Sequence, residues 1–566
     1  MRELFRRLLL HKPLAVEIAV ASFFVNILYL ASPIFVIQIL SRYIGYGFDG
    51  TLYTLTSGML IALALGMGFS IVRTRMCSAV SEDSDRQLQE QVLESLAHAK
   101  SAAMDRIPTA RVQDVLAGPL IVQSAYEASR IASVLDMPFF ILFILCIFVL
   151  SPALALVTLL AVGSTVLAGK LNMNKAKKLD RVMREESVRH RGSVGAAISG
   201  TETVRAFRGS NYLHRLWHEQ IHRLMEAREQ IVTQRSWSLA IVTVLNSLLK
   251  VAVYAVGAKL VVSGDLSVGS LIGASILSAK ALQISSSFMQ SVLQMSKAQE
   301  ALRMIHEFAS LPRETSGGKA MKEFSGRLEF HDVAMAYPGA TGPLFESLST
   351  VIEPGSVVGI LGANGTGKTT LAKLIVGLLE PGRGQVLADG VDLRQLSAEW
   401  WRTQVLYLPQ EPRFLNGTYK ENITLLNPDI EDARLNEIVR QADLRRFLDS
   451  TPTGIDTEIA DGGRSLPVGI RKRLALARAL VGEGRIAVLD EPTEGLDVEG
   501  CEAVFQVMNM LVQRHTTIIV VSRDQNIVKG FGMAIDLNSK PVPIVGRVQK
   551  KNASANETAS TSKERP

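Results

Sequence analysis

The stretch Gly362-Ala363-Asn364-Gly365-Thr366-Gly367-Lys368-Thr369 decides the fold of the second half of this 566-residue chain. It fits the pattern G-x-x-x-x-G-K-[ST], in which glycines let backbone N–H groups surround phosphate oxygens. The apolar, β-branched residues 356–361 precede it and the helix-like residues 371–376 follow it, which is the context that the pattern requires. The sequence therefore predicts a nucleoside-triphosphate site, with Lys368 on the β/γ oxygens and the Thr369 hydroxyl on magnesium.

Composition indicates a membrane part joined to a soluble part, because 47% of the residues are hydrophobic and the mean hydropathy is positive. The net charge of +7 is explained by basic residues that are scattered or flank apolar runs, so we expect no nucleic-acid partner. Cys77, Cys146 and Cys501 are far apart and lack C-x-x-C spacing, which argues against a disulfide framework and a zinc site.

Six apolar runs approach or exceed the ~20 residues that cross a bilayer. They predict transmembrane helices at residues 14–40, 52–72, 133–150, 153–169, 238–262 and 266–282. The third and fourth runs are separated by two residues, which indicates a tight helical hairpin.

Basic residues such as Arg6, Arg73 and Lys170 flank one side of the spans, whereas the short loops on the other side hold few. The positive-inside rule therefore places both termini and the long segments 73–132 and 170–236 in the cytoplasm. Both segments are charged and helix-patterned, so we expect the spans to continue as helices beyond the membrane.

The fold class predicted for the chain is multidomain. Residues 1–306 form a six-span α-helical membrane domain, and the polar, Gly-rich residues 307–326 form a linker. Strands then alternate with helices over residues 327–546, which suits an α/β P-loop domain. Residues 547–566 contain no apolar cluster and are expected to be a disordered tail.

Residues 485–491 form an apolar strand that ends in Asp490 and Glu491. At this tip Asp490 can hold magnesium through water, and Glu491 can act as the base or orienter for attacking water. The next residues are Pro492-Thr493-Glu494-Gly495-Leu496-Asp497. With the phosphate loop upstream, they make the segment resemble the ATP-binding cassette of ABC transporters, a resemblance that covers nearly the whole chain.

This resemblance implies ATP and Mg²⁺ as ligands and adds two residues to the site. Tyr337 stands where the family stacks adenine on an aromatic ring, although an ordinary strand tyrosine is the alternative. Gln410 matches the Q-loop glutamine, which touches magnesium and faces the membrane domain. Asp497 matches the D-loop aspartate, although Glu494 and Gly495 replace the family's small residues before it.

Two positions depart from the family pattern. The signature L-S-G-G-Q, which caps the γ-phosphate of ATP held by the opposite subunit, is replaced by Leu466-Pro467-Val468-Gly469-Ile470. Pro467 removes a hydroxyl and an N–H, and Val468 adds bulk where phosphate approaches. Arg523 replaces the switch histidine, and its guanidinium could substitute in part by binding phosphate.

The resemblance thus implies three sets of site residues. The catalytic set is Glu491, Gln410 and Arg523, and the metal-binding set is Thr369, Gln410 and Asp490. The nucleotide-binding set is Tyr337, Gly362, Ala363, Asn364, Gly365, Thr366, Gly367, Lys368, Thr369 and Thr370.

The departures bear on which cassette completes the site. Loss of one preorganised donor typically costs roughly 10²- to 10³-fold in turnover, so two losses would leave little. The alternative is that the departures are neutral in an active enzyme. In a homodimer both ATP sites would contain the altered signature and Arg523. A second half-transporter with an intact signature would instead complete the ATP site at this chain's phosphate loop. We favour the heterodimer.

The membrane half resembles type I secretion ABC proteins. Asp136-Met137-Pro138-Phe139 matches their D-x-P-[FW] motif, although Ser41 replaces an aspartate of the first hairpin. Six residues fall at spacings similar to that hairpin: Asn26, Pro33, Gln38, Arg42, Thr51 and Leu52.

This second resemblance implies ATP-driven export of an unfolded protein across the bacterial inner membrane, with a periplasmic adaptor and an outer-membrane channel. The alternatives are an exporter of lipid or small molecules, or an ATP-binding regulatory subunit that hydrolyses little. Lys250, near the centre of the fifth span, either snorkels, pairs at a subunit interface or lines the transport path.

Overall fold

The computed structural model describes residues 2–314, 317–337, 339 and 342–547. The chain divides into two compact units, Met1–Ala99 with Asp105–Leu311, and Lys100–Met104 with Pro312–Pro566. The break between Leu311 and Pro312 falls inside the segment for which we predicted a linker. Apart from Arg547, the tail for which we predicted disorder lies outside the described residues.

Within the described residues, six helices are long and apolar enough to cross a membrane, which confirms the six predicted spans. They are Lys12–Tyr46, Asp49–His98, Ala128–Leu150, Pro152–Ser199, Ser210–Val262 and Val268–Ala309. The predicted hairpin is also present, because one helix ends at Leu150 and the next begins at Pro152. Proline suits the first helical position, where its missing N–H would have no intrahelical partner.

Four of these helices are 42 to 53 residues long: α5 (Asp49–His98), α10 (Pro152–Ser199), α12 (Ser210–Val262) and α13 (Val268–Ala309). At 1.5 Å per residue, α5 extends roughly 75 Å, more than twice the ~30 Å hydrocarbon core. The spans therefore continue as helices well beyond a bilayer.

Two of the six spans are made of several shorter elements. The span Lys12–Tyr46 consists of α2 (Lys12–Tyr29), α3 (Ala31–Gln38), η1 (Ile39–Tyr43) and α4 (Ile44–Tyr46), and the span Ala128–Leu150 consists of α8 (Ala128–Leu135), η2 (Met137–Phe139) and α9 (Phe140–Leu150). The other helices of this unit are α1 (Arg2–Leu10), α7 (Thr109–Ala125) and α11 (Thr201–Ala206). The helix α6 (Ser101–Met104) belongs to the other unit.

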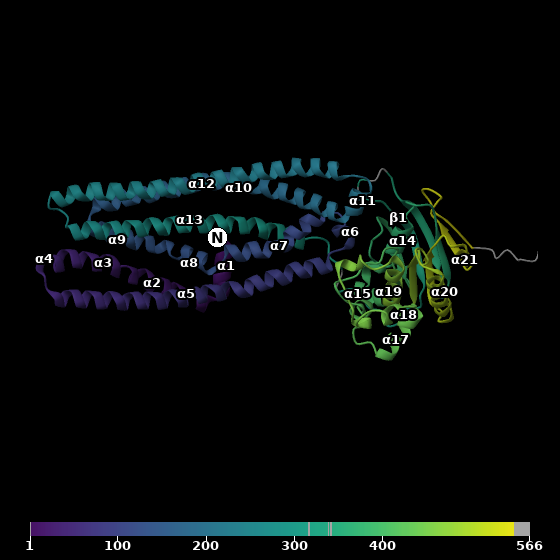
Figure 1. Ribbon diagram of the computed structural model, residues 1–566. Helices are drawn as coiled ribbons and strands as arrows, with labels where there is room; N and C mark the ends of the chain where they lie inside the picture. The colour runs from purple at the N-terminus through teal and green to yellow at the C-terminus, as the bar shows by residue number, and fades with distance from the viewer. Residues whose placement is uncertain (1, 315–316, 338, 340–341, 548–566) are drawn as a thin grey trace, which may run out of the picture. The chain divides into compact units, whose positions relative to one another are not determined.

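Helix α13 is the most buried span of the bundle and runs beside α10 and α12 (Figure 1). Small residues on α13 also allow it to pack closely against α3. A Cβ built on Gly269 would lie 2.9 Å from the carbonyl oxygen of Ile37, and one on Gly273 would overlap the Ile37 side chain. Small residues bring helix backbones together, which is how helices associate where lipid supplies no hydrophobic driving force.

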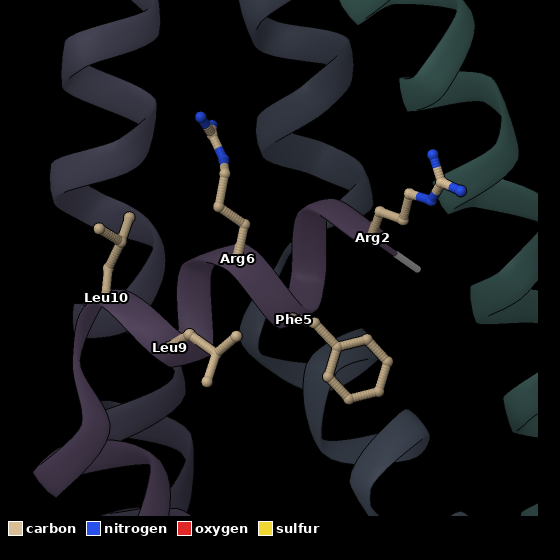
Figure 2. Close-up of a pocket in the computed structure, with 5 residues that line it drawn as sticks. All are labelled: Arg2, Phe5, Arg6, Leu9 and Leu10. Atoms are coloured by element: carbon tan, nitrogen blue, oxygen red, sulfur yellow. The ribbon is translucent and has the colours of Figure 1, made fainter.

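Helix α1 is amphipathic and is fixed to the bundle by one buried arginine. The Arg7 side chain is 1% exposed, pairs with Asp85 at 2.8 Å and lies 4.5 Å from the Tyr126 ring centroid. The opposite face carries two basic and three apolar side chains, as Figure 2 shows: Arg2, Arg6, Phe5, Leu9 and Leu10. An exposed face of this composition suits the membrane–water interface.

The second unit contains a six-stranded sheet of order β12-β11-β3-β10-β9-β6. Its strands are β3 (Val357–Leu361), β6 (Val405–Leu408), β9 (Ile486–Asp490), β10 (Thr517–Val521), β11 (Met533–Asp536) and β12 (Ile544–Arg547). All pair in parallel except the edge strand β12. This parallel core confirms the predicted α/β P-loop fold.

A four-stranded antiparallel sheet of order β2-β1-β4-β5 and a two-stranded ribbon, β7-β8, accompany it. Their strands are β1 (Leu328–Met335), β2 (Phe345–Ile352), β4 (Arg383–Ala388), β5 (Val391–Asp392), β7 (Gly417–Thr418) and β8 (Glu458–Ile459). The helices of this unit are α14 (Lys368–Ile375), α15 (Ala398–Thr403), α16 (Tyr419–Ile423), α17 (Asp432–Gln441), α18 (Arg445–Asp449), α19 (Val468–Leu480), α20 (Val498–Gln513) and α21 (Gln525–Val528).

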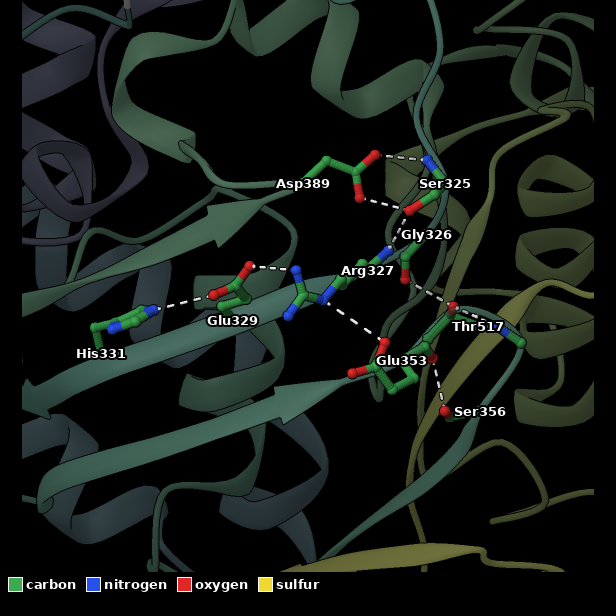
Figure 3. A network of polar contacts seen from close by, with 10 residues as sticks. Ser325, Gly326, Arg327, Glu329, His331, Glu353, Ser356, Asp389 and Thr517 are labelled. Carbon is green, nitrogen blue, oxygen red and sulfur yellow. Dashed lines mark hydrogen bonds and ion pairs between the residues drawn. The ribbon is translucent and has the colours of Figure 1, made fainter.

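A polar network ties the two larger sheets together at the amino end of β10 (Figure 3). The Thr517 hydroxyl donates to the carbonyl of Gly326 at 2.7 Å, just before β1. Arg327 then pairs with Glu329 at 3.0 Å and with Glu353 at 3.6 Å. The network therefore joins the sheets at the amino end of β10, whereas the predicted site residues lie at its carboxyl end.

Candidate functional site

The predicted site residues gather where four parallel strands end. The phosphate loop follows β3, Asp490 ends β9, Arg523 lies two residues beyond β10, and Gln410 lies two residues beyond β6. The register pairs Val521 of β10 with Asp490 and with Ile360, so these strand ends are level. Ligands of open α/β sheets bind at this carboxyl edge.

The backbone of the phosphate loop takes conformations that glycine adopts without strain. Gly365 and Gly367 have φ angles of +78° and +107°, and a Cβ on Gly367 would approach Leu344 to 2.6 Å. The Lys368 ammonium donates to the carbonyls of Gly362 at 3.0 Å and Ala363 at 3.1 Å. The Lys368 ammonium group is thus held over the loop at the start of α14. The N–H groups at a helix start also favour an anion, so both features suit phosphate.

A side chain distant in sequence braces this loop. The Ala363 N–H donates to the Asn538 amide oxygen at 2.8 Å, and the Thr366 hydroxyl donates to the Ala363 carbonyl at 2.9 Å. Sequence reasoning missed Asn538, which follows β11 and has no local pattern to identify it. It holds the loop from outside the phosphate motif.

Asp490 has the environment expected of a group that holds a cation. It is fully buried, and among the described residues neither carboxylate oxygen has a partner of good hydrogen-bond geometry. Burial raises the pKa of Asp490, against the opposing effects of the Thr369 hydroxyl and the Lys368 ammonium. A buried, unpaired carboxylate beside a hydroxyl fits Mg²⁺, which prefers oxygen ligands.

Glu491 follows in a strained backbone conformation, with φ of +48°. Its N–H donates to the Val521 carbonyl at 2.8 Å. Burial raises the pKa of its carboxyl group, opposed by the Lys368 charge and reinforced by the neighbouring carboxylates Glu494 and Asp490. A raised pKa makes Glu491 a stronger base for a proton from water.

Gln410 and Arg523 each contact a neighbouring residue of the site. The Gln410 amide donates to Glu494 at 3.3 Å. The Arg523 guanidinium is exposed and donates to the Asn364 side chain of the phosphate loop. Arg523 also lines a hollow with Gly362 and with Ser522, Gln525, Val528 and Lys529. The structure therefore brings Arg523 to the phosphate loop.

Tyr337 lies beside the phosphate loop. Its hydroxyl lies 3.1 Å from that of Thr370, the third residue of α14, while 46% of the residue is exposed. The contact fixes one end of the ring and leaves it accessible to a flat ligand such as a base.

The signature segment 466–470 forms the start of α19 and offers few donors there. Pro467 occupies the N-cap position without a side-chain cap, and Val468 is 50% exposed at the first helical position. Val468 packs toward Gly495, where a built Cβ would lie 3.0 Å from its Cγ1. Phosphate approaching this helix end would meet a proline and a valine.

In the membrane unit, Asp136 joins three elements of the bundle. It accepts from the Asn26 amide of α2 at 2.7 Å and from Arg73 of α5 at 2.8 Å. Nearby, the Lys280 ammonium of α13 lies 4.1 Å from the Tyr29 ring centroid. Sequence reasoning singled out Asn26 and Asp136 but missed the contact of Asp136 with Arg73. Lys250 lies on an exposed face of α12.

Comparisons with known proteins agree with both units. Residues 16–285 match the family described as the ABC transporter transmembrane region, and residues 345–494 match the family described as ABC transporter. The toxin RTX-I translocation ATP-binding protein of Actinobacillus pleuropneumoniae is 26% identical over 521 residues, which cover 91% of this chain and 73% of that protein. The alpha-hemolysin translocation ATP-binding protein HlyB of Escherichia coli is 25% identical over 529 residues, with the same coverage.

Similarity also extends beyond the toxin translocators. Antigen peptide transporter 2 of Rattus norvegicus is 29% identical over 397 residues, covering 68% of this chain and 56% of that protein. A solved structure of a bacterial Atm1-family ABC exporter with ATP bound matches the fold with a TM-score of 0.84 at 20% identity, over 95% of each chain. With an exporter membrane domain followed by an ABC-type ATPase cassette coupled to transport, this chain is an ABC exporter half-transporter.

Proposed function

We propose that this half-transporter is the permease/ATPase component of a type I protein secretion system in the bacterial inner membrane. Its substrate is an unfolded protein that passes to a periplasmic adaptor and an outer-membrane channel. The basic flanks of the spans support an orientation with both termini and the cassette in the cytoplasm.

The observation that carries this proposal is the Asp136 contact. Asp136 belongs to the D-x-P-[FW] motif and Asn26 to the first hairpin, and these were the features of the membrane half that resembled secretion proteins. The structure places the two side chains 2.7 Å apart, with Arg73 on the same carboxylate oxygen. Two toxin translocators similar to this chain over 91% of its length add support.

The geometry of the cassette supports a division of roles in hydrolysis. Lys368 and the loop N–H groups bind the β/γ oxygens of ATP, and Tyr337 stacks on adenine. Thr369, Asp490 and Gln410 would hold Mg²⁺, which neutralises phosphate charge when bound. Glu491 takes the proton of the attacking water, and Arg523 faces the γ-phosphate beside Asn364. ATP binding closes the cassettes and opens the path outward; hydrolysis resets them.

We further propose that the partner is a different half-transporter. ABC half-transporters dimerise, and in a head-to-tail pair this phosphate loop would face the partner's signature helix. An intact partner signature would supply the donors that Pro467 and Val468 do not. The same observation supports a second candidate function, an ATP-binding regulatory subunit with little hydrolysis of its own.

The test is secretion by the source bacterium. Deleting the gene should remove one or a few proteins from the culture medium, and the wild-type gene should restore them while a Glu491→Gln gene does not. An unchanged set of secreted proteins with altered lipid or small-molecule efflux would overturn the secretion proposal.

The partner is identified by purifying the tagged chain from its native membrane and assaying the ATPase activity of each assembly. A second half-transporter in stoichiometric amount is expected. A homodimer with robust turnover would contradict both the heterodimer and the regulatory subunit.

A further inference from the structure

The ammonium group of Lys472 is buried next to the turn that carries Glu491. Lys472 is the fifth residue of α19, and its side chain is 3% exposed. A buried ammonium group is costly unless acceptors surround it. Its Nζ donates to the Glu491 carbonyl at 2.5 Å and lies 3.8 Å from a carboxylate oxygen of Glu494. Both acceptors belong to the turn after β9.

The Glu491 backbone needs such support, because φ of +48° is strained for any residue other than glycine. Strained residues persist only where their surroundings over-determine them. The N–H of Glu491 is held by Val521, and its carbonyl accepts from Lys472 and, at 3.3 Å, from the Glu494 N–H. Lys472 therefore fixes one of the two peptide groups that flank the Glu491 side chain.

Glu494 extends this contact to a third segment. The carboxylate oxygen that faces Lys472 also accepts from the Gln410 amide at 3.3 Å. Lys472 comes from α19, Glu494 from the turn after β9, and Gln410 from the segment after β6. One oxygen thus joins three segments of the cassette.

The same helix carries the signature segment. Val468 precedes Lys472 by four residues, so the two side chains lie one above the other on one face of α19. Val468 also approaches Gly495, the neighbour of Glu494. A partner that contacts Val468 at the start of α19 would therefore be one helical turn from Lys472, which holds the Glu491 carbonyl.

We propose that Lys472 and Glu494 are positioning residues that hold the strained Glu491 turn in its hydrolytic geometry and connect it to the signature helix and to Gln410. This inference rests on the proposed role of Glu491 in hydrolysis. Neither residue touches the reacting atoms; they act through the Glu491 backbone and the Gln410 amide.

The test compares Lys472→Met and Glu494→Gln in the purified native assembly, each also placed in a chain that carries Pro467→Ser, Val468→Gly and Ile470→Gln. Methionine keeps the length of the side chain without its donor. Because a misplacement of about 1 Å can cost 10²-fold in rate, we expect Lys472→Met to lower kcat roughly 10- to 100-fold. The KM for ATP should change less than about twofold, since the phosphate loop is untouched. Glu494→Gln should lower kcat less, because a glutamine oxygen can still accept from Gln410.

Two further measurements separate positioning from general stability. The double variant should be no slower than Lys472→Met alone, because residues in contact act non-additively. Hydrogen exchange of residues 491–496 should be faster in Lys472→Met, with the exchange of β3 and β10 unchanged. The matched control is Glu499→Gln, which breaks an exposed pair with Arg446 and should leave kcat unchanged.

The outcomes are distinct from those that test the proposed function. An unchanged kcat and unchanged exchange of residues 491–496 in Lys472→Met, while Glu491→Gln is inactive, would overturn the positioning role alone. If Glu491→Gln itself retained full turnover, the proposed role of Glu491 would be wrong. If Lys472→Met fails to fold, Glu494→Gln decides. A loss of kcat/KM in Glu494→Gln that comes entirely from a higher KM for ATP, with kcat unchanged, would overturn the inference.

Discussion

The phosphate loop and the first turn of α19 are both junctions between a loop and a helix, yet they present opposite surfaces to phosphate. At the first, Gly367 takes a left-handed conformation and Lys368 begins α14 with its ammonium held over the loop. At the second, Pro467 lacks an N–H and Val468 is half-exposed where an anion would arrive. A helix N-terminus binds phosphate only where donors are free and bulk is absent. Under the proposed assignment of these two junctions, the chain keeps the half of the site that it uses itself and alters the half that it would lend to a partner.

The largest expected effect comes from removing the base on the intact half. Glu491→Gln should lower ATPase turnover by roughly 10²- to 10⁴-fold, the range typical of a general base. Binding of ATP should remain, because the amide is isosteric and the phosphate loop is unchanged. Steady-state ATPase assays and equilibrium ATP binding on the same preparation measure the two effects. Loss of binding together with turnover would mean that Glu491 supports the site structurally.

The pH dependence of turnover checks the same residue. Burial raises the pKa of Glu491, so its carboxyl group loses its proton at a higher pH than an ordinary glutamate does. A base acts only when deprotonated, and the acid limb of kcat/KM should therefore lie above the usual value near 4.5. This acid limb should disappear in the residual activity of Glu491→Gln.

The next effect is a gain on the altered half. Pro467→Ser, Val468→Gly and Ile470→Gln together restore a hydroxyl and free N–H groups at the start of α19. One preorganised donor is worth roughly 10²- to 10³-fold, so turnover of the homodimer should rise by about 10²-fold. Thr451→Ser, a conservative change elsewhere in the cassette, is the control. No increase would mean that the altered signature does not limit hydrolysis.

Local motifs and long-range contacts differ in how far the sequence predicts them. The phosphate loop was predictable because its glycines, Lys368 and Thr369 are contiguous and their conformations are local. The braces were not. Asn538 lies 175 residues from the loop residue that it holds, and Asp136 lies 110 residues from Asn26.

Contacts at such separations depend on how strands and helices pack, and one sequence does not record that. Lys472 illustrates the limit best, since no local pattern indicates its burial against Glu491. The six spans, in contrast, follow from apolar length alone.

A smaller loss is expected at Arg523, which joins the intact half through Asn364. Hydrogen bonds to charged groups contribute about 1.5 kcal/mol at the low end, so Arg523→Ala should lower kcat by about tenfold. Lys529→Ala removes the same charge beside the same hollow and should have little effect. If both variants lost activity equally, net charge rather than the guanidinium contact would explain the role of Arg523.

The smallest effect is expected at Tyr337, which is assigned to the adenine base and not to the γ-phosphate that reacts. Stacking of an aromatic pair contributes about 1 kcal/mol beyond its buried area, so Tyr337→Ala should raise the KM for ATP about fivefold with kcat unchanged. Tyr337→Phe keeps the ring and removes only the contact with Thr370, and its KM should stay near that of the wild type. If Phe behaved like Ala, the hydroxyl contact that holds α14 would be the important feature and adenine stacking would be wrong. If both retained the wild-type KM, Tyr337 would be an ordinary surface residue, and the intact half of the site would consist of the phosphate loop, Asp490 and Glu491 without an aromatic base platform.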